Sequence, residues 1–181
     1  MPGAGKTSLI RVLESMGHFV VEEAATDLIA MDQAAGISQP WEDPSFVDRV
    51  MTLQCQRQVQ TVNVTSDPQF FDRGPLDTIA LSRFLGRTPS PALLAEVART
   101  EEDKIYQRTV FFVENLGLLV QSDVRQITLE QALTFEKIHE QVYAEYGYEC
   151  VKIAPQSIPD RVREILQCVN GPGPMKPLPG N

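Results

Sequence analysis

The chain opens on a glycine-rich stretch, residues 1–8, which reads MPGAGKTS. Its Gly5-Lys6-Thr7 ending matches the last three positions of the phosphate-binding loop G-x-x-x-x-G-K-[ST], in which backbone N–H groups turn inward around phosphate oxygens. Apolar residues recur at helical spacing after Thr7, and Gly17 ends that run. This context favours a loop that leads into a helix, whose N-terminus attracts anions.

Each position of such a loop has its own partner. The predicted nucleotide contacts are Gly3, Ala4, Gly5, Lys6, Thr7 and Ser8. Lys6 would reach the outer phosphates and Thr7 would offer its hydroxyl to Mg²⁺, so we expect ATP or GTP with Mg²⁺ as the cofactors. The alternative interpretation is a flexible N-terminal tail ahead of an ordinary helix.

The motif lacks its first position. Counting back from Gly5 places the first glycine one residue before Met1, and the strand that should precede the loop is missing. A strand and a turn need about ten residues, so we expect the true chain to start roughly that far upstream. Met1 would then be an internal methionine.

Length, charge and cysteine content narrow the class of protein. A chain of 181 residues is long enough for one domain, which we place at 1–169 as an N-terminally truncated P-loop NTPase domain, with a disordered Pro/Gly-rich tail at 170–181. The net charge of −8 argues against a general nucleic-acid binder. Three cysteines without a C-x-x-C pair favour reduced thiols in the cytoplasm. No apolar run is long enough to predict a transmembrane segment.

A short run of β-branched and aromatic residues, 18–21, predicts a buried strand that ends at Glu22 and Glu23. Ligands of open parallel sheets bind beyond the carboxyl ends of the strands. Glu22 or Glu23 could therefore contact a substrate or a magnesium-bound water. Equally, both residues could simply begin the next helix, predicted over 24–35, where acidic residues suit the helix dipole.

A second strand end carries two opposite charges. Phe70 and Phe71 predict a short buried strand, and Asp72 follows at the position where a Walker B aspartate holds magnesium through water. Arg73 could bind an anionic group of an acceptor through paired hydrogen bonds. The alternative is an ordinary strand-to-helix turn with an Asp–Arg pair on the surface.

The other predicted elements alternate between helix and strand. Asp43 and Pro44 should open a long helix, and further helices are expected over 75–84, 90–106, 128–146 and from 157, with strands over 109–113 and 148–154. Arg125 precedes a capping box formed by Thr128 and Gln131. In a phosphotransferase a lid would fold there, so Arg125 could neutralise the transferred phosphate. It could also be a surface arginine.

Four stretches together carry a resemblance to a known family, and they are residues 3–7 (GAGKT), 21–25 (VEEAA), 40–44 (PWEDP) and 70–77 (FFDRGPLD). They resemble the NadR-like AAA-type predicted ATPases, and the likeness extends through 123–125 and 146–148. Members are similar in fold to nucleoside and nucleotide kinases. The resemblance implies a three-layer α/β/α fold with a parallel sheet in the order 2-3-1-4-5. It also implies ATP or GTP binding with Mg²⁺, with Lys6 and Thr7 as phosphate and metal contacts and Asp72 as the Walker B-type acid.

The leading functional hypothesis is a small-molecule kinase or ATPase. Its catalytic residues would be Lys6, Asp72, Arg73 and Arg125, its metal contacts Thr7 and Asp72, and its substrate contacts Glu22 or Glu23 and Arg73. The alternative is a regulatory module that holds GTP or ATP as a switch and recognises a protein partner or a lipid head group without phosphotransfer.

Overall fold

The structure is a computed structural model that describes residues 5–61, 68–114 and 128–171. Gly3, Ala4 and Arg125 of the predicted site, and nearly all of the predicted tail, lie outside these ranges. The described helices are α1 (Lys6–Ser15), α2 (Ala24–Ala34), the 3₁₀ helix η1 (Pro40–Glu42), α3 (Phe46–Thr61), α4 (Pro75–Phe84), α5 (Pro91–Glu102), α6 (Leu129–Glu145) and α7 (Ile158–Asn170). The strands are β1 (Phe19–Val21), β2 (Gln69–Phe71), β3 (Thr109–Val113) and β4 (Glu149–Ile153).

The described strands form two parallel pairs. β1 pairs with β2, with Val20 opposite Phe70, and β3 pairs with β4, with Phe111 opposite Val151. The mixed α/β class with parallel strands is therefore confirmed. The continuous order 2-3-1-4-5 stays a prediction, because these strands make two separate sheets of two.

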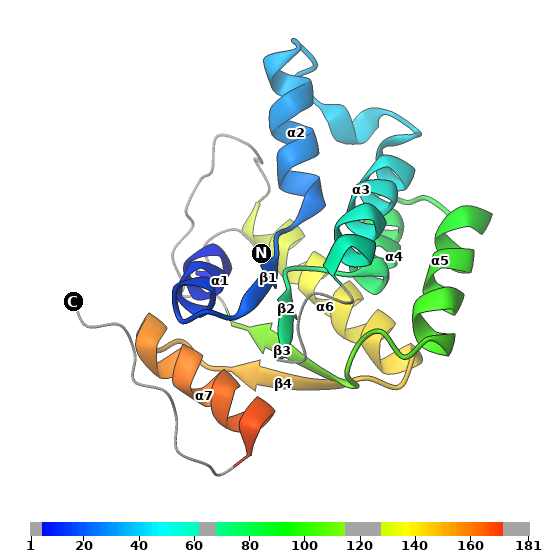
Figure 1. The fold of residues 1–181 in the computed structure, drawn as a ribbon. Coiled ribbons are helices and arrows are strands. Elements are labelled where there is room, and N and C mark those ends of the chain that lie inside the picture. The colour runs from blue at the N-terminus through cyan, green and yellow to red at the C-terminus, as the bar shows by residue number, and fades with distance from the viewer. Residues whose placement is uncertain (1–4, 62–67, 115–127, 172–181) are drawn as a thin grey trace.

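Helices cover both faces of the β3–β4 pair (Figure 1). Side chains alternate along β3, so Val110 and Phe112 pack against the core built by α4 and α6, whereas Phe111 and Val113 pack against α1 and α7. Val20 of β1 joins the second core as well. The two strand pairs thus share one apolar layer with α1 and α7.

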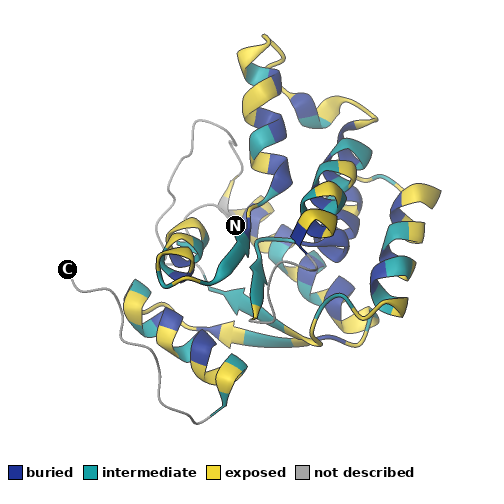
Figure 2. Cartoon of the chain, in the orientation of Figure 1, coloured by how far each residue is buried: buried dark blue, intermediate teal, exposed yellow. Residues whose placement is uncertain are grey.

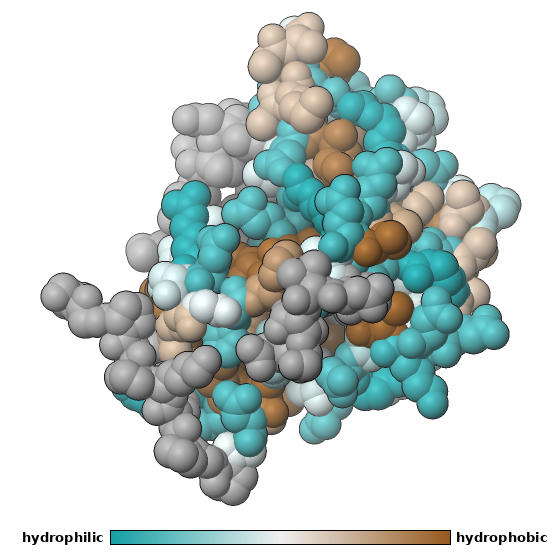
Figure 3. All heavy atoms as spheres, viewed as in Figure 1, coloured by the Kyte–Doolittle hydropathy of each residue, from teal (hydrophilic) through white to brown (hydrophobic). Residues whose placement is uncertain are grey.

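Burial is deepest in the helices around these strands (Figure 2). The strand residues are mostly of intermediate burial, and Figure 3 shows hydrophobic atoms near the centre of the face, in the region of β1 and β2. A third apolar cluster joins α2 to α3 through Ile29, Phe46 and Val50. It holds these two helices beside the carboxyl ends of β1 and β2 (Figure 1).

Two predicted helix boundaries are wrong. α3 begins at Phe46 and not at Pro44, because the Asp43 carboxylate accepts hydrogen bonds from the backbone N–H and the hydroxyl of Ser45 and so closes a turn before the helix. α5 ends at Glu102 and not near Tyr106, because Lys104 adopts a left-handed backbone with φ of 51°. Among the described helices, none has the length and apolar character needed to cross a membrane.

Candidate functional site

The carboxyl ends of β1 and β2 lie side by side and place four charged residues at one edge. The backbone N–H of Asp72 donates to the carbonyl of Val21 at 2.7 Å, one step beyond the paired strands. Glu22 and Glu23 therefore leave β1 where Asp72 and Arg73 leave β2, as the parallel pairing requires.

The described part of the predicted phosphate loop forms the start of α1. Gly5 is the N-cap, and its φ of 75° lies in the left-handed region that glycine adopts without strain. Leu9 donates its N–H to the Gly5 carbonyl at 3.0 Å, which begins the helical hydrogen bonding. Thr7 and Ser8 are exposed. A helix N-terminus with exposed hydroxyls is the kind of place that can bind an anion.

Lys6 and Asp72 influence each other electrostatically at this edge. Burial, followed by repulsion from Arg73, lowers the pKa of Lys6, while Asp72 and Glu23 oppose that shift. Burial raises the pKa of Asp72, and attraction from Arg73 and Lys6 opposes it. The structure therefore brings Lys6, Glu23, Asp72 and Arg73 within electrostatic reach of one another.

Arg73 occupies the turn between β2 and α4 with an unusual backbone. Its φ of 83° is left-handed, a conformation that costs a non-glycine residue on the order of 1 kcal/mol. Its Nη1 donates to Asp77 Oδ1 at 2.9 Å and to His139 Nε2 at 3.1 Å, and its Nε lies 3.9 Å from Glu23 Oε1. Although burial disfavours the charge, the carboxylates of Asp77, Glu23 and Asp72 raise the pKa of Arg73.

Asp77 is the buried partner of Arg73. Its Oδ2 accepts from the backbone N–H of Gly74 at 2.8 Å and from the hydroxyl of Tyr143 at 2.6 Å. Burial is the largest single influence and favours the neutral acid, but the attraction of Arg73 and the hydrogen bonds from Tyr143 and Arg73 together oppose it, and the pKa of Asp77 is lowered. Its carboxylate is thus ionised and hydrogen-bonded at both oxygens, as a buried charge requires.

His139 of α6 completes this arrangement, and we call Arg73, Asp77, His139 and Tyr143 the buried tetrad. Nδ1 lies 2.7 Å from the Phe135 carbonyl, which requires a proton on Nδ1. Nε2 therefore accepts from Arg73. Burial and the neighbouring guanidinium lower the pKa of His139 to about 4, so the ring is neutral at pH 7.

Gln54 connects α3 to both strand ends. Its Oε1 accepts from the backbone N–H of Ala24 at 3.0 Å, and its Nε2 donates to the backbone carbonyl of Arg73 at 3.2 Å. The side chain is buried, with 3% of the residue exposed. One amide thereby joins α3, the start of α2 and the turn after β2.

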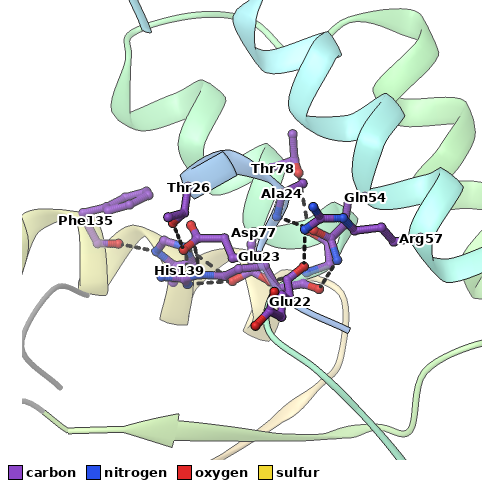
Figure 4. Close-up of polar contacts among 12 residues, drawn as sticks. Glu22, Glu23, Ala24, Thr26, Gln54, Arg57, Asp77, Thr78, Phe135 and His139 are labelled. Atoms are coloured by element: carbon purple, nitrogen blue, oxygen red, sulfur yellow. Dashed lines mark hydrogen bonds and ion pairs between the residues drawn. The ribbon is translucent and has the colours of Figure 1, made fainter. Parts of the chain in front are cut away.

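The structure distinguishes between Glu22 and Glu23, which the sequence left as alternatives. Glu22 is exposed, and its backbone carbonyl accepts from Arg57 at 3.0 Å. The Glu23 carboxylate accepts from Thr26 at 3.0 Å (Figure 4), and its Oε1 faces Arg73. Glu23 thus begins α2 and borders the site at the same time.

Glu23 and Arg73 stand at a partly open pocket, which we call the Glu23–Arg73 pocket. Its other lining residues come from α2, α3, α4 and α6 and are Ala24, Ala25, Val50, Gln54, Asp77, Thr78, Leu81, Phe135 and His139. The walls lie close together, so the enclosed space holds little more than roughly one water molecule. Any larger ligand requires these walls to separate.

The residues present fit a magnesium ion that is held mainly by a nucleotide. Within the described ranges, no group of three or more His, Cys, Asp or Glu side chains is placed to bind a metal ion. Mg²⁺ does not need one, because it keeps several waters and takes one or two carboxylates together with phosphate oxygens. Thr7 and Asp72 could supply the protein oxygens at this site.

Sequence reasoning did not assign a role to Gln54, Asp77, His139 or Tyr143. One local signal was available: Asp77 stands at the third position of a helix that Gly74 and Pro75 open, where a carboxylate accepts from the N-cap N–H. Another was the i, i+4 spacing of His139 and Tyr143, which places both on one face of α6. Neither signal identifies Arg73 as the common partner.

The sequence was compared with known proteins, and one protein family matches it. No curated protein and no solved structure matches the chain significantly. A family model described as an AAA domain matches residues 1–161, which include α1, all four described strands and the charged edge between them. The match supports nucleotide binding of the P-loop type. With most of its length covered by that model, the chain belongs to the AAA domain family.

Proposed function

We propose that this AAA domain binds ATP or GTP with Mg²⁺ at the start of α1 and transfers the γ-phosphate to a small molecule in the Glu23–Arg73 pocket. One observation carries the proposal. Lys6 and Asp72, on the nucleotide side, lie within electrostatic reach of Glu23 and Arg73, which line the pocket. A donor phosphate and an acceptor would therefore meet at the same edge.

The roles follow from the chemistry of the side chains. Lys6 contacts the outer phosphates, and backbone N–H groups of Gly3, Ala4, Gly5 and Ser8 surround them. Thr7 and Asp72 hold the metal, which neutralises charge on the phosphates when it is bound. Arg73 stabilises the transferred group, and Arg125 remains a second candidate for that role. Positioning and electrostatic stabilisation would supply most of the rate.

A regulatory switch is the second candidate function, and the narrow pocket favours it. Walls that enclose roughly one water molecule suit a protein that binds a nucleotide without holding an acceptor. Such a module would hydrolyse nucleotide slowly, and no small molecule would change that rate. Its partner would be a protein or a lipid head group. For either function a cytoplasmic location is our proposal, supported by three free cysteines.

Calorimetric titration with MgATP and MgGTP tests the nucleotide site. Lys6→Ala should weaken binding at least tenfold, which corresponds to about 1.4 kcal/mol, because a phosphate contact is lost. The matched control is Lys152→Ala, since this lysine is exposed and pairs with Glu140 on the surface at 2.9 Å. It should change the affinity less than about twofold. Equal binding by the Lys6→Ala variant and the wild type would refute the proposal, as would the absence of binding to either nucleotide.

A further inference from the structure

The Glu23–Arg73 pocket has a distinctive balance of charge. Among its lining residues the structure shows two carboxylates, Glu23 and Asp77, and one guanidinium, Arg73. His139 also lines the pocket and is neutral at pH 7. Counted over the described residues, the charges on the lining therefore sum to −1.

The one guanidinium is already matched by anions of the protein. Arg73 Nη1 bonds Asp77 and His139, and Nε faces Glu23. Asp77 cannot release Arg73 easily, because Gly74 and Tyr143 hold its other oxygen. Beyond the transferred phosphoryl group, Arg73 thus has little positive charge left for a second anionic group inside the pocket.

A phosphate monoester is a poor match for such a lining. It carries about −1.5 to −2 charges at pH 7, and proteins hold it with clusters of arginines and lysines or with helix N-termini. Placed beside Glu23 and Asp77, it would be repelled by both carboxylates. This differs from the sequence-based expectation that Arg73 grips an anionic group of the acceptor.

An uncharged alcohol suits the same lining. The Glu23 carboxylate can accept a hydrogen bond from a hydroxyl group, which is the common way to bind one. The remaining walls are largely apolar, with Ala25, Val50, Leu81 and Phe135 from four different helices. They favour an apolar or ring-shaped remainder of the acceptor.

From this balance we propose that the acceptor is an uncharged hydroxyl compound and not a phosphorylated one, and that its hydroxyl is bound by Glu23. The inference rests on the proposed phosphotransferase function and names its substrate class. In the transfer, the hydroxyl oxygen forms a bond to the γ-phosphorus, and the bond from that phosphorus to the β–γ bridging oxygen breaks. The bridging oxygen leaves with the electron pair as ADP, and the hydroxyl proton passes through Glu23 to solvent.

The test measures ADP formation from MgATP with matched pairs of acceptors. The pairs are glycerol with glycerol 3-phosphate, ribose with ribose 5-phosphate, and uridine with its 5′-monophosphate, with mass spectrometry of the products. We expect at least one uncharged member to raise the rate at least tenfold and its phosphorylated counterpart to leave the rate at background. A rise with a phosphorylated member overturns the inference, and so does MgATP binding without a rise from any compound.

MgATP titration separates this outcome from failure of the proposed function. Where MgATP does not bind the wild-type chain, the proposed function itself is wrong. If MgATP binds but no acceptor raises the rate of ADP formation, nucleotide binding is confirmed and the inference about the acceptor is wrong.

A matched pair of variants locates the hydroxyl contact. Glu23→Gln should lower the acceptor-stimulated rate at least tenfold, since the amide is a weaker acceptor and cannot take the proton. Glu22→Gln changes the neighbouring exposed carboxylate and should leave the stimulated rate unchanged. Equal stimulated rates in the two variants would remove Glu23 from the acceptor contact.

Discussion

The two halves of the candidate site differ in how far their hydroxyl and charged groups are exposed. At the start of α1, Thr7 and Ser8 are exposed and face solvent. In the buried tetrad, Arg73 and Asp77 are hydrogen-bonded to protein groups on both sides. The exposed hydroxyls of Thr7 and Ser8 can meet a ligand, whereas the polar groups of the tetrad hold the fold and orient Arg73.

The largest effect should come from breaking the tetrad. Asp77→Ala leaves the Arg73 guanidinium without its buried partner, and such a loss typically destabilises a protein by about 3–5 kcal/mol. Urea unfolding would measure the change in the free energy of unfolding. The control is Glu145→Ala, which removes the exposed pair with Arg83 and should cost less than about 1 kcal/mol. Similar losses in the two variants would show that the tetrad does not hold the fold.

The second largest effect should come from His139, which makes the free energy of unfolding depend on pH. Its pKa is about 4 in the folded chain and 6.5 in an unfolded reference, so the unfolded state binds more protons between these values. Stability should be fully present above pH 6.5 and fall as the pH drops toward 4, by roughly 3 kcal/mol at most.

Urea unfolding from pH 7 to pH 4.5 measures this dependence. Arg73 and Asp77 also face the ring, so the contribution of His139 is the difference between the wild type and His139→Gln. The variant should lose stability less steeply than the wild type as the pH falls. A slope that is unchanged by His139→Gln would contradict the assigned neutral ring.

The smallest effect on stability should come from the α1 side, and it sharpens the comparison. Thr7→Ala changes an exposed hydroxyl, so we expect the free energy of unfolding to move by no more than about 0.5 kcal/mol. The same change should weaken Mg²⁺-dependent ATP binding roughly tenfold. On the same sample, thermal unfolding measures the change in stability and calorimetry measures the change in ATP affinity. Loss of stability without loss of affinity would reverse the roles that we assign to the two regions.

Local sequence patterns predicted much of the fold. The capping box of Thr128 and Gln131 and the apolar run in β3 correspond to observed elements, because both signals lie within a few residues of the structure they determine. The start of α3 was mispredicted because Asp43 and Pro44 are equally suited to a turn.

The candidate site was predictable only where a motif defines it. Lys6, Asp72 and Arg73 follow from the phosphate-loop pattern and the strand end. The hydrogen bond between Tyr143 and Asp77 joins residues 66 positions apart and depends on how α6 packs on α4. Periodicity and propensity carry no information on such a pairing, and the left-handed backbone of Arg73 has no signal in its residue type.

Gln54 holds two walls of the pocket together. Its amide ties α3 to the first turn of α2 and to the backbone of Arg73, while the tetrad ties α6 to the same turn. Separating the walls therefore requires whole hydrogen bonds to break, and gradual spreading is resisted. We expect entry into the pocket to be an all-or-none opening with a rate of its own, distinct from the rate of any chemistry that follows.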